Sequence, residues 1–213
     1  MKQERERAIN VPGPVLALMA AIFGCFAIQS AFGVDRVAAT YGFAPQQLFE
    51  GNFAPLVIAL FLHGGWLHAL ANAGFALAFA TPVARRMEMA RFGVPAFFVF
   101  YLICGVVGNL GYAAHNPHGE NPLIGASGAV AGMMGAASRL MWPGPGLAPF
   151  RSPMVLGLAA SWIVINVIFG MVLIGWTPGS GGAPIAWEAH LAGYAAGLFL
   201  LAPTLHITDR LGR

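Results

Sequence analysis

Two short segments of this sequence each place one reactive side chain at the start of an apolar run. Ser127 lies in the sequence Gly-Ala-Ser-Gly, and His190 is followed by glycine three and seven positions later. A serine hydroxyl becomes a nucleophile when a neighbouring base can take its proton, and histidine is the base used most often. If the two segments lie side by side, Ser127 and His190 predict acyl-transfer chemistry.

Small residues at helical spacing accompany both side chains. Gly193 and Gly197 share the helical face of His190, and Gly128 begins a similar series of small residues after Ser127. Helices with such faces can pack with their backbones close together. The pattern therefore predicts that the two helices meet. Read alone, the pattern of small residues favours helix packing without catalysis.

The residues before Ser127 indicate that a helix begins close to it. Asn121, Pro122 and Gly125 are residues typical of turns and helix starts. The first backbone N–H groups of a helix have no partner inside the helix, and the helix dipole is positive at that end. We therefore expect the N–H groups around Ser127 to suit the oxyanion of an acyl-transfer intermediate.

A third cluster extends from His63 to Asn72. His68 and Asn72 are four residues apart and share a helical face, so both could donate a hydrogen bond to a negative oxygen. His63 is separated from His68 by two glycines and is expected in a loop or at a helix start. A zinc site is the weaker interpretation, because the chain has no HExxH motif and asparagine is a poor zinc ligand. We expect no metal ion and no cofactor.

Other polar residues in the apolar runs are interpreted as structural. Asn109, Ser161 and Asn166 are expected to form hydrogen bonds between helices. Glu188 is two residues before His190, on a different helical face, and no acidic partner of the histidine is assigned. Tyr194 follows His190 by one helical turn and could contact its ring.

The composition is that of a membrane protein. Hydrophobic residues make up 58% of the 213 residues and charged residues 9%, and the mean hydropathy is +0.70. A helix that crosses a bilayer needs roughly 20 apolar residues. We therefore predict an all-α membrane protein with one domain at residues 11–205, an N-terminal tail at 1–10 and a C-terminal tail at 206–213. The six predicted spans are Val15–Ala31, Leu56–Ala80, Val94–Ala114, Gly125–Trp142, Met154–Gly175 and Trp187–Pro203.

The distribution of basic residues predicts the topology. With six spans, ten of the eleven lysine and arginine residues lie on one side, and only Arg36 lies on the other. Basic residues accumulate in cytoplasmic loops. We therefore expect both termini in the cytoplasm, and we expect no nucleic-acid partner. The ten residues are Lys2, Arg5, Arg7, Arg85, Arg86, Arg91, Arg139, Arg151, Arg210 and Arg213.

Taken together, these features resemble the rhomboid family of intramembrane serine proteases, over roughly residues 53–203. The run from His63 to Asn72 is similar to the family's HxxxxHxxxN signature. Gly-Ala-Ser-Gly around Ser127 is similar to its GxSG motif, and the run that begins at Ala189 is similar to its AHxxGxxxG motif. All three motifs stand in the family's order and spacing.

The resemblance implies a six-helix rhomboid-like bundle and a site for cleaving transmembrane segments of other membrane proteins within the lipid bilayer. It implies Ser127 as the nucleophile and His190 as the general base. His68, Asn72 and the Ser127 backbone N–H would form the oxyanion hole. His63 would be structural, and Gly125 would be the motif glycine near the oxyanion. The expected location is a bacterial cytoplasmic membrane.

The sequence departs from the family pattern at three places. Ala54 and Pro55 stand where many members carry Trp-Arg, and Ala84 stands where many carry a glutamate. Ala131 replaces a tyrosine that packs on the catalytic histidine. We expect another aromatic ring, with Tyr194 as a candidate, to hold His190 in place.

Two other functions remain open at this stage. An inactive rhomboid-like protein could bind membrane clients without cutting them, and the three departures are compatible with it. A small transporter or channel is disfavoured, because the chain has no internal repeat and no charged pathway through the spans.

Overall fold

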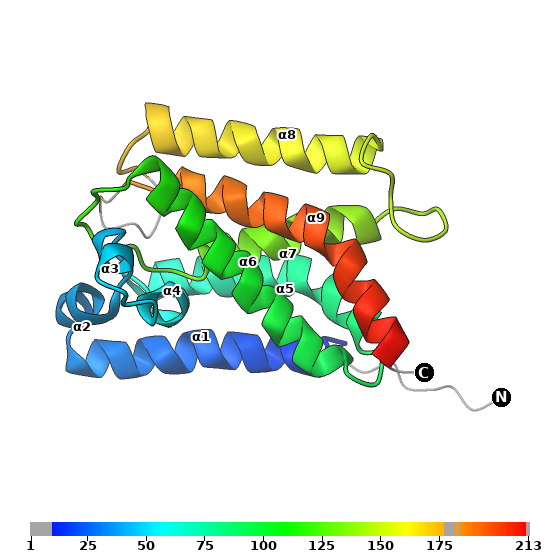
Figure 1. The fold of residues 1–213 in the computed structure, drawn as a ribbon, viewed down its shortest axis with the longest axis horizontal. Coiled ribbons are helices and arrows are strands. Elements are labelled where there is room, and N and C mark those ends of the chain that lie inside the picture. Colours follow the sequence, from blue (N-terminus) through cyan, green and yellow to red (C-terminus); the bar gives the residue numbers. More distant parts are fainter. Residues whose placement is uncertain (1–9, 177–181, 183, 212–213) are drawn as a thin grey trace.

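The structure is a computed structural model that describes residues 10–176, 182 and 184–211. These residues form a bundle of helices (Figure 1). The single β-bridge among them joins Phe43 to Leu123. In chain order the elements are α1 (Gly13–Phe32), α2 (Val34–Tyr41), α3 (Gln46–Phe49), α4 (Pro55–Ile58), η1 (Ala59–Phe61), α5 (Trp66–Met87), α6 (Gly93–His115), α7 (Ser127–Leu140), α8 (Pro153–Val167), η2 (Ile168–Val172) and α9 (Trp187–Leu211).

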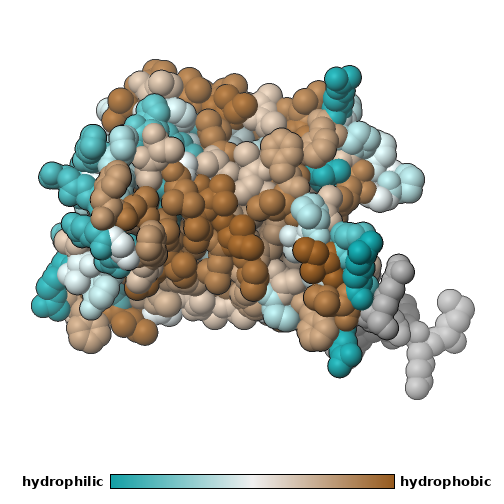
Figure 2. All heavy atoms as spheres, viewed as in Figure 1, coloured by the Kyte–Doolittle hydropathy of each residue, from teal (hydrophilic) through white to brown (hydrophobic). Residues whose placement is uncertain are grey.

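Five of the described helices are long and apolar enough to cross a membrane. They are α1, α5, α6, α9 and the helix formed by α8 with η2. Hydrophobic residues cover the middle of the face shown in Figure 2, and hydrophilic residues gather at its two ends. This distribution fits an integral membrane protein, because lipid chains favour apolar side chains and the headgroup regions favour polar ones.

α7 is the short central helix of the bundle. It has 14 residues, and every residue from Gly128 to Arg139 is buried. Because it is enclosed by α5, α6 and α9, it needs no lipid-facing surface and no full membrane length. The fourth predicted span, Gly125–Trp142, is correctly located, but the helix within it is shorter than a complete crossing.

Glycines bring α7 and α9 into backbone contact. A methyl group at Gly193 would overlap the carbonyl oxygen of Gly128, and one at Gly197 would overlap that of Gly132. Only a residue without a side chain permits this approach. The prediction that the two small-residue faces meet is confirmed.

The second predicted span, Leu56–Ala80, begins too early. The chain forms the short helices α4 and η1, leaves helical geometry at Leu62, and starts the long helix α5 at Trp66. Gly64 and Gly65 lie in this interruption, where their low helix propensity favours a break. Hydropathy falls at His63 and the two glycines, and His63 lies outside a helix as expected, so only the start of the predicted span is wrong.

The sixth predicted span ends too early, because α9 continues through Pro203 to Leu211. A proline removes one backbone hydrogen bond, and membrane helices commonly tolerate this loss. The last turns of α9 thus include residues assigned from the sequence to the C-terminal tail. The start of α1 and the end of α9 lie at the same end of the bundle, whereas α2, which carries Arg36, lies at the opposite end (Figure 1). This arrangement agrees with an even number of spans.

Candidate active site

Ser127 is the first residue of α7, and the turn before it is held by backbone contacts. The Gly125 N–H donates to the Ala59 carbonyl at 2.9 Å, and the bridge between Phe43 and Leu123 ties the same segment to the loops at that end of the bundle. Gly125 has φ of +129°, a conformation that L side chains rarely adopt. The glycine therefore permits the turn that delivers Ser127 to the helix start.

Ser127 and His190 form a hydrogen bond. The distance from Ser127 Oγ to His190 Nε2 is 2.8 Å. Both residues are partly exposed. The contact depends on the close packing of α7 against α9, because the residues are 63 positions apart in the chain. The structure thus brings together the two side chains that the sequence singled out.

His190 has a second partner that the sequence did not predict. Its Nδ1 lies 2.8 Å from Asn166 Oδ1 on α8. Asn166 is buried, and its Nδ2 donates to the Trp162 carbonyl at 2.8 Å. The expectation of a hydrogen bond between helices was right for Asn166, but its partner proves to be the histidine of the site. The available signal was the spacing of Trp162 and Asn166, four residues apart on one face of an apolar helix.

The aromatic ring beside His190 is that of Trp162. The two ring centroids are 5.6 Å apart, and the ring planes are inclined by 41°. Tyr194 instead lies in the buried apolar cluster with Ala131, Met134 and Trp162. The expectation that another ring takes the place of the missing tyrosine is confirmed, but the ring is that of Trp162 on α8 and not the candidate Tyr194.

His68 presents an N–H group beside the turn that carries Ser127. Its Nδ1 lies 3.3 Å from the Gly64 backbone nitrogen and accepts that N–H. Since a neutral imidazole has one proton, the proton is then on Nε2. A side-chain carbon at Gly125 would lie 3.0 Å from His68 Nε2 and 3.7 Å from Ser127 Oγ. A hydrogen-bond donor of His68 therefore lies close to the serine.

Asn72 lies one turn after His68 and is buried. Its Nδ2 donates to the His68 carbonyl at 3.0 Å. The amide nitrogen carries two hydrogens, so one donor is used within α5. Asn72 is therefore hydrogen-bonded to the backbone of its own helix, one turn from His68.

His63 is completely buried between two other rings. The ring centroid of Phe26 lies at 6.3 Å and that of His68 at 5.1 Å, both in edge-to-face arrangements. Gln29 of α1 holds the His63 backbone from both sides: its Nε2 donates to the carbonyl at 3.0 Å, and its Oε1 accepts the N–H at 2.9 Å. Burial, with a further effect of His68, lowers the pKa of the His63 imidazole to about 3, and the Phe61 carbonyl opposes this shift. His63 therefore lies between α1 and the His68 ring, where it can support that ring.

Glu188 makes its contacts away from the imidazole of His190. Its Oε1 accepts from Asn116 Nδ2 at 3.1 Å and lies 3.8 Å from His115 Nε2. These contacts join the end of α6 to the start of α9. Over the described part of the chain, no three histidine, cysteine, aspartate or glutamate side chains converge as metal ligands would.

The fold and the site define a helical membrane protein with a serine–histidine pair at the end of a short central helix. The rhomboid domain model matches residues 50–207, and the chain belongs to the rhomboid family. This membership confirms the resemblance inferred from the three motifs.

Two curated relatives are similar over most of this chain. "RHOMBOID-like protein 5" of Arabidopsis thaliana is 28% identical over 162 residues, which are 71% of this chain and 44% of that protein. "Putative rhomboid protease YdcA" of Bacillus subtilis (strain 168) is 27% identical over 151 residues, which are 71% of this chain and 67% of that protein. The match thus spans less than half of the plant protein and two thirds of the bacterial one.

Proposed function

We propose that this protein is an intramembrane serine endopeptidase that cleaves transmembrane segments of other membrane proteins. The observation that carries the proposal is the 2.8 Å hydrogen bond between Ser127 Oγ and His190 Nε2. Membership of the rhomboid family supports the same reaction class. No cofactor or metal ion is needed for this chemistry.

In the first half of the reaction, Ser127 Oγ attacks the carbonyl carbon of a substrate peptide bond while His190 Nε2 takes the hydroxyl proton. The carbonyl oxygen becomes an oxyanion. The proposed donors to this oxyanion are the His68 side chain, the Ser127 backbone N–H and the second amide hydrogen of Asn72. The C–N bond then breaks, and the leaving amine receives the proton from His190.

In the second half, water hydrolyses the ester between Ser127 and the substrate. His190 takes a proton from the attacking water and returns it to Ser127 Oγ as the ester bond breaks. The acidic product fragment leaves as a carboxylate. Both halves use one base, so the loss of either Ser127 or His190 stops the whole cycle.

The proposed orientation follows from the basic residues. Both termini would lie in the cytoplasm of a bacterial cell, with the protein in the cytoplasmic membrane. Ser127, at the opposite end of α7 from Leu140, would then lie toward the outer surface. A substrate helix would have to unwind there to expose a peptide bond, and glycine or proline in the substrate would favour unwinding.

A cleavage assay with purified protein in liposomes and a model transmembrane substrate tests the proposal. Ser127→Ala and His190→Ala should each abolish cleavage, and the double variant should be as inactive as either single one. Ser161→Ala, on the exposed face of α8, is the matched serine control and should cleave normally. Cleavage by the Ser127→Ala protein would refute the proposal. A folded wild-type protein that binds substrates without cutting them would identify the inactive alternative.

A further inference from the structure

Asn166 is the buried polar residue on a helix that otherwise faces outward. The buried residues of α8 are Val155, Trp162 and Asn166 alone, all on one face. The exposed fraction of Asn166 is 1%. An amide is expensive to bury unless its hydrogen-bonding groups are satisfied. Both ends of this amide have partners, and one of them is the imidazole of His190.

The two contacts of Asn166 determine which nitrogen of His190 carries the proton. The Trp162 carbonyl can only accept, so it must face the amide nitrogen of Asn166. The amide oxygen therefore faces His190 Nδ1, and an oxygen without a hydrogen can only accept. His190 Nδ1 must then donate, and in the neutral imidazole Nε2 is left with its lone pair directed at Ser127 Oγ.

We propose that Asn166 is a positioning residue that holds His190 in the tautomer and orientation required of a general base. This inference rests on the proposed function. Trp162 serves the same end from the same helix, because its carbonyl orients the amide and its ring packs against the imidazole. The resulting chain of contacts runs from Trp162 through Asn166 and His190 to Ser127.

The alternative is a hydrogen bond that only joins α8 to α9. The alternative predicts that replacing Asn166 lowers stability and leaves the kinetics of the surviving folded protein unchanged. A positioning role predicts a lower kcat with an unchanged KM, because Asn166 contacts the base rather than the substrate. It also predicts a change in the pH profile when the partner of Nδ1 changes charge. His68, whose Nε2 lies beside the turn at Gly125, is another titratable side chain of the site.

The experiment compares Asn166→Leu, Asn166→Asp and the wild type, each checked for folding by thermal unfolding. Asn166→Leu should lower kcat by about 10²-fold, as a small misplacement of a reacting group does, and should slow labelling of Ser127 by a fluorophosphonate probe. Asn166→Asp keeps an acceptor for Nδ1–H and should recover most of the lost rate. Its carboxylate favours the protonated imidazole, so the acid limb of its pH–rate profile should move to higher pH.

Asn109→Leu is the matched control, because Asn109 is a buried amide whose hydrogen bond goes to the Leu56 carbonyl of α4 and not to His190. It should lower stability and leave the shape of the pH–rate profile unchanged. Equal kcat in folded Asn166→Leu and wild type would overturn the inference, as would an Asn166→Asp protein no faster than Asn166→Leu. Failure of the wild type to cleave or to label would instead refute the proposed function itself.

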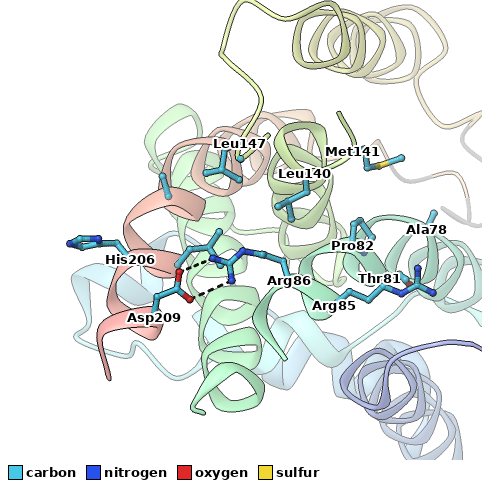
Figure 3. A pocket seen from close by; sticks show the side chains of 13 residues that line it. Ala78, Thr81, Pro82, Arg85, Arg86, Leu140, Met141, Leu147, His206 and Asp209 are labelled. Atoms are coloured by element: carbon cyan, nitrogen blue, oxygen red, sulfur yellow. Dashed lines mark hydrogen bonds and ion pairs between the residues drawn. The ribbon is translucent and has the colours of Figure 1, made fainter. Parts of the chain in front are cut away.

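A second, independent feature lies at the other end of α7. A hollow of about 790 Å³ opens between the ends of α5, α7 and α9 (Figure 3). Leu140, Met141 and Leu147 lie along one side of it. Figure 3 shows Arg86 reaching from α5 to Asp209 on α9, with Leu140 and Leu147 above this pair in the view.

Among the residues that the structure describes, the polar lining of the hollow has two arginines and one aspartate, and so an excess of positive charge. Arg86 pairs with Asp209 at 2.7 Å, which neutralises one arginine. Arg85 donates from Nη2 to the Asn10 carbonyl, an uncharged acceptor, and its guanidinium has further N–H groups. His206 also lines the hollow and is exposed. Thus a cation and a titratable ring adjoin an apolar wall at the end of the bundle where α9 finishes.

We propose that this hollow binds an anionic glycerophospholipid, with its phosphate beside Arg85 and its acyl chains along the leucine wall. Basic pockets between membrane helices are suited to anionic headgroups. An arginine also matches a phosphate with paired N–H donors. The apolar wall favours a lipid over a free phosphate ion, because only the lipid brings chains that cover it.

Native mass spectrometry of the detergent-purified protein, titrated with phosphatidylglycerol, tests this second proposal. Phosphatidylglycerol should be retained in preference to phosphatidylcholine, and Arg85→Gln should weaken retention about fivefold, the effect of one basic residue near a headgroup. Arg91→Gln, whose arginine lies over the Phe92 ring outside the hollow, is the matched control and should retain the lipid as the wild type does. Equal loss of phosphatidylglycerol binding in Arg85→Gln and Arg91→Gln would overturn the proposal. Equal retention of phosphatidylglycerol and phosphatidylcholine by the wild type would also overturn it. Full displacement by inorganic phosphate would identify a free-anion site instead.

Discussion

The indole of Trp162 packs against the imidazole of His190, with ring centroids 5.6 Å apart. The two side chains come from different helices, α8 and α9, and Ala131 of α7 lies in the same buried cluster as the indole. In many rhomboids a tyrosine at the position of Ala131 is the ring beside the histidine. Here a small residue on α7 leaves room for a large ring from α8.

Ala131→Tyr should therefore destabilise the protein. Ala131 is 1% exposed and belongs to the cluster that Trp162 fills. An added ring in a packed interior costs about 1–3 kcal/mol, and kcat should not rise. Combining it with Trp162→Ala should recover part of the lost stability. Thermal unfolding and kcat of the single and double variants provide the measurement, and faster turnover of a fully stable Ala131→Tyr protein would contradict this geometry.

Gly197→Ala should destabilise the contact between α7 and α9. A methyl group at this position overlaps the Gly132 carbonyl oxygen, and backbone atoms cannot move aside as a flexible side chain can. We expect a loss of about 1–3 kcal/mol or more, together with lower activity, because His190 would move away from Ser127. Gly157→Ala on α8 is the control: open space surrounds that position, so its stability should be unchanged or slightly higher. Equal stability of the two variants would show that the close helix contact is absent.

His68→Ala should lower kcat more than Asn72→Ala does. The His68 Nε2–H lies beside the turn that carries Ser127, whereas one Asn72 donor is already used on the His68 carbonyl. Loss of one oxyanion donor typically lowers kcat by about 10²–10³-fold. Because several donors would share the oxyanion here, the effect of His68→Ala should be smaller than this. Steady-state kinetics of both variants make the comparison. A change confined to KM in both variants would indicate substrate contacts rather than oxyanion stabilisation.

The buried His63 should make the protein less stable in acid. The folded protein binds a proton on His63 only near pH 3, because the pKa is lowered to about 3, whereas the unfolded chain does so near pH 6.5. Between these values the unfolded state binds more protons, so stability falls as the pH falls, by about 1.4 kcal/mol for each pH unit. Above about pH 6.5 this effect is absent.

Unfolding of wild type and His63→Leu across pH 4 to 8 isolates this contribution. The stability of the wild type relative to the variant should be constant above about pH 6.5 and should decline below it. If the curves of stability against pH for wild type and His63→Leu stay parallel over the whole range, the prediction of a lowered His63 pKa is wrong.

The reactive residues could be predicted from the sequence because their motifs are local. The types and spacing around Ser127 and His190 contain both the side chains and the glycines that bring them together, so the contact between α7 and α9 followed from helical periodicity. The second span was started too early because the apolar residues of α4 and η1 were joined to it, although His63 and the glycine pair before Trp66 already indicated a break. The length of α7 was missed because a helix enclosed by other helices is as apolar as one that faces lipid.

The contacts of Asn166 and Trp162 could not be predicted, because no local pattern states which helix face meets the histidine. Many members of the rhomboid family present a ring to that histidine from the helix of the serine, whereas this chain does so from α8. Only the packing of α8 along α9 shows that the ring beside the histidine comes from α8. Which helix faces meet depends on the contacts that each helix makes with all its neighbours, and a single sequence does not contain that information.

Covalent labelling of Ser127 tests the central claim most directly. The purified protein in detergent is incubated with a fluorophosphonate probe, and the modified residue is located by peptide mass spectrometry. The wild type and the Ser161→Ala control should carry one adduct on Ser127, His190→Ala should label far more slowly, and Ser127→Ala should not label. A folded wild-type protein that stays unlabelled, or an adduct that persists in Ser127→Ala, would contradict the assignment of Ser127 as an activated nucleophile.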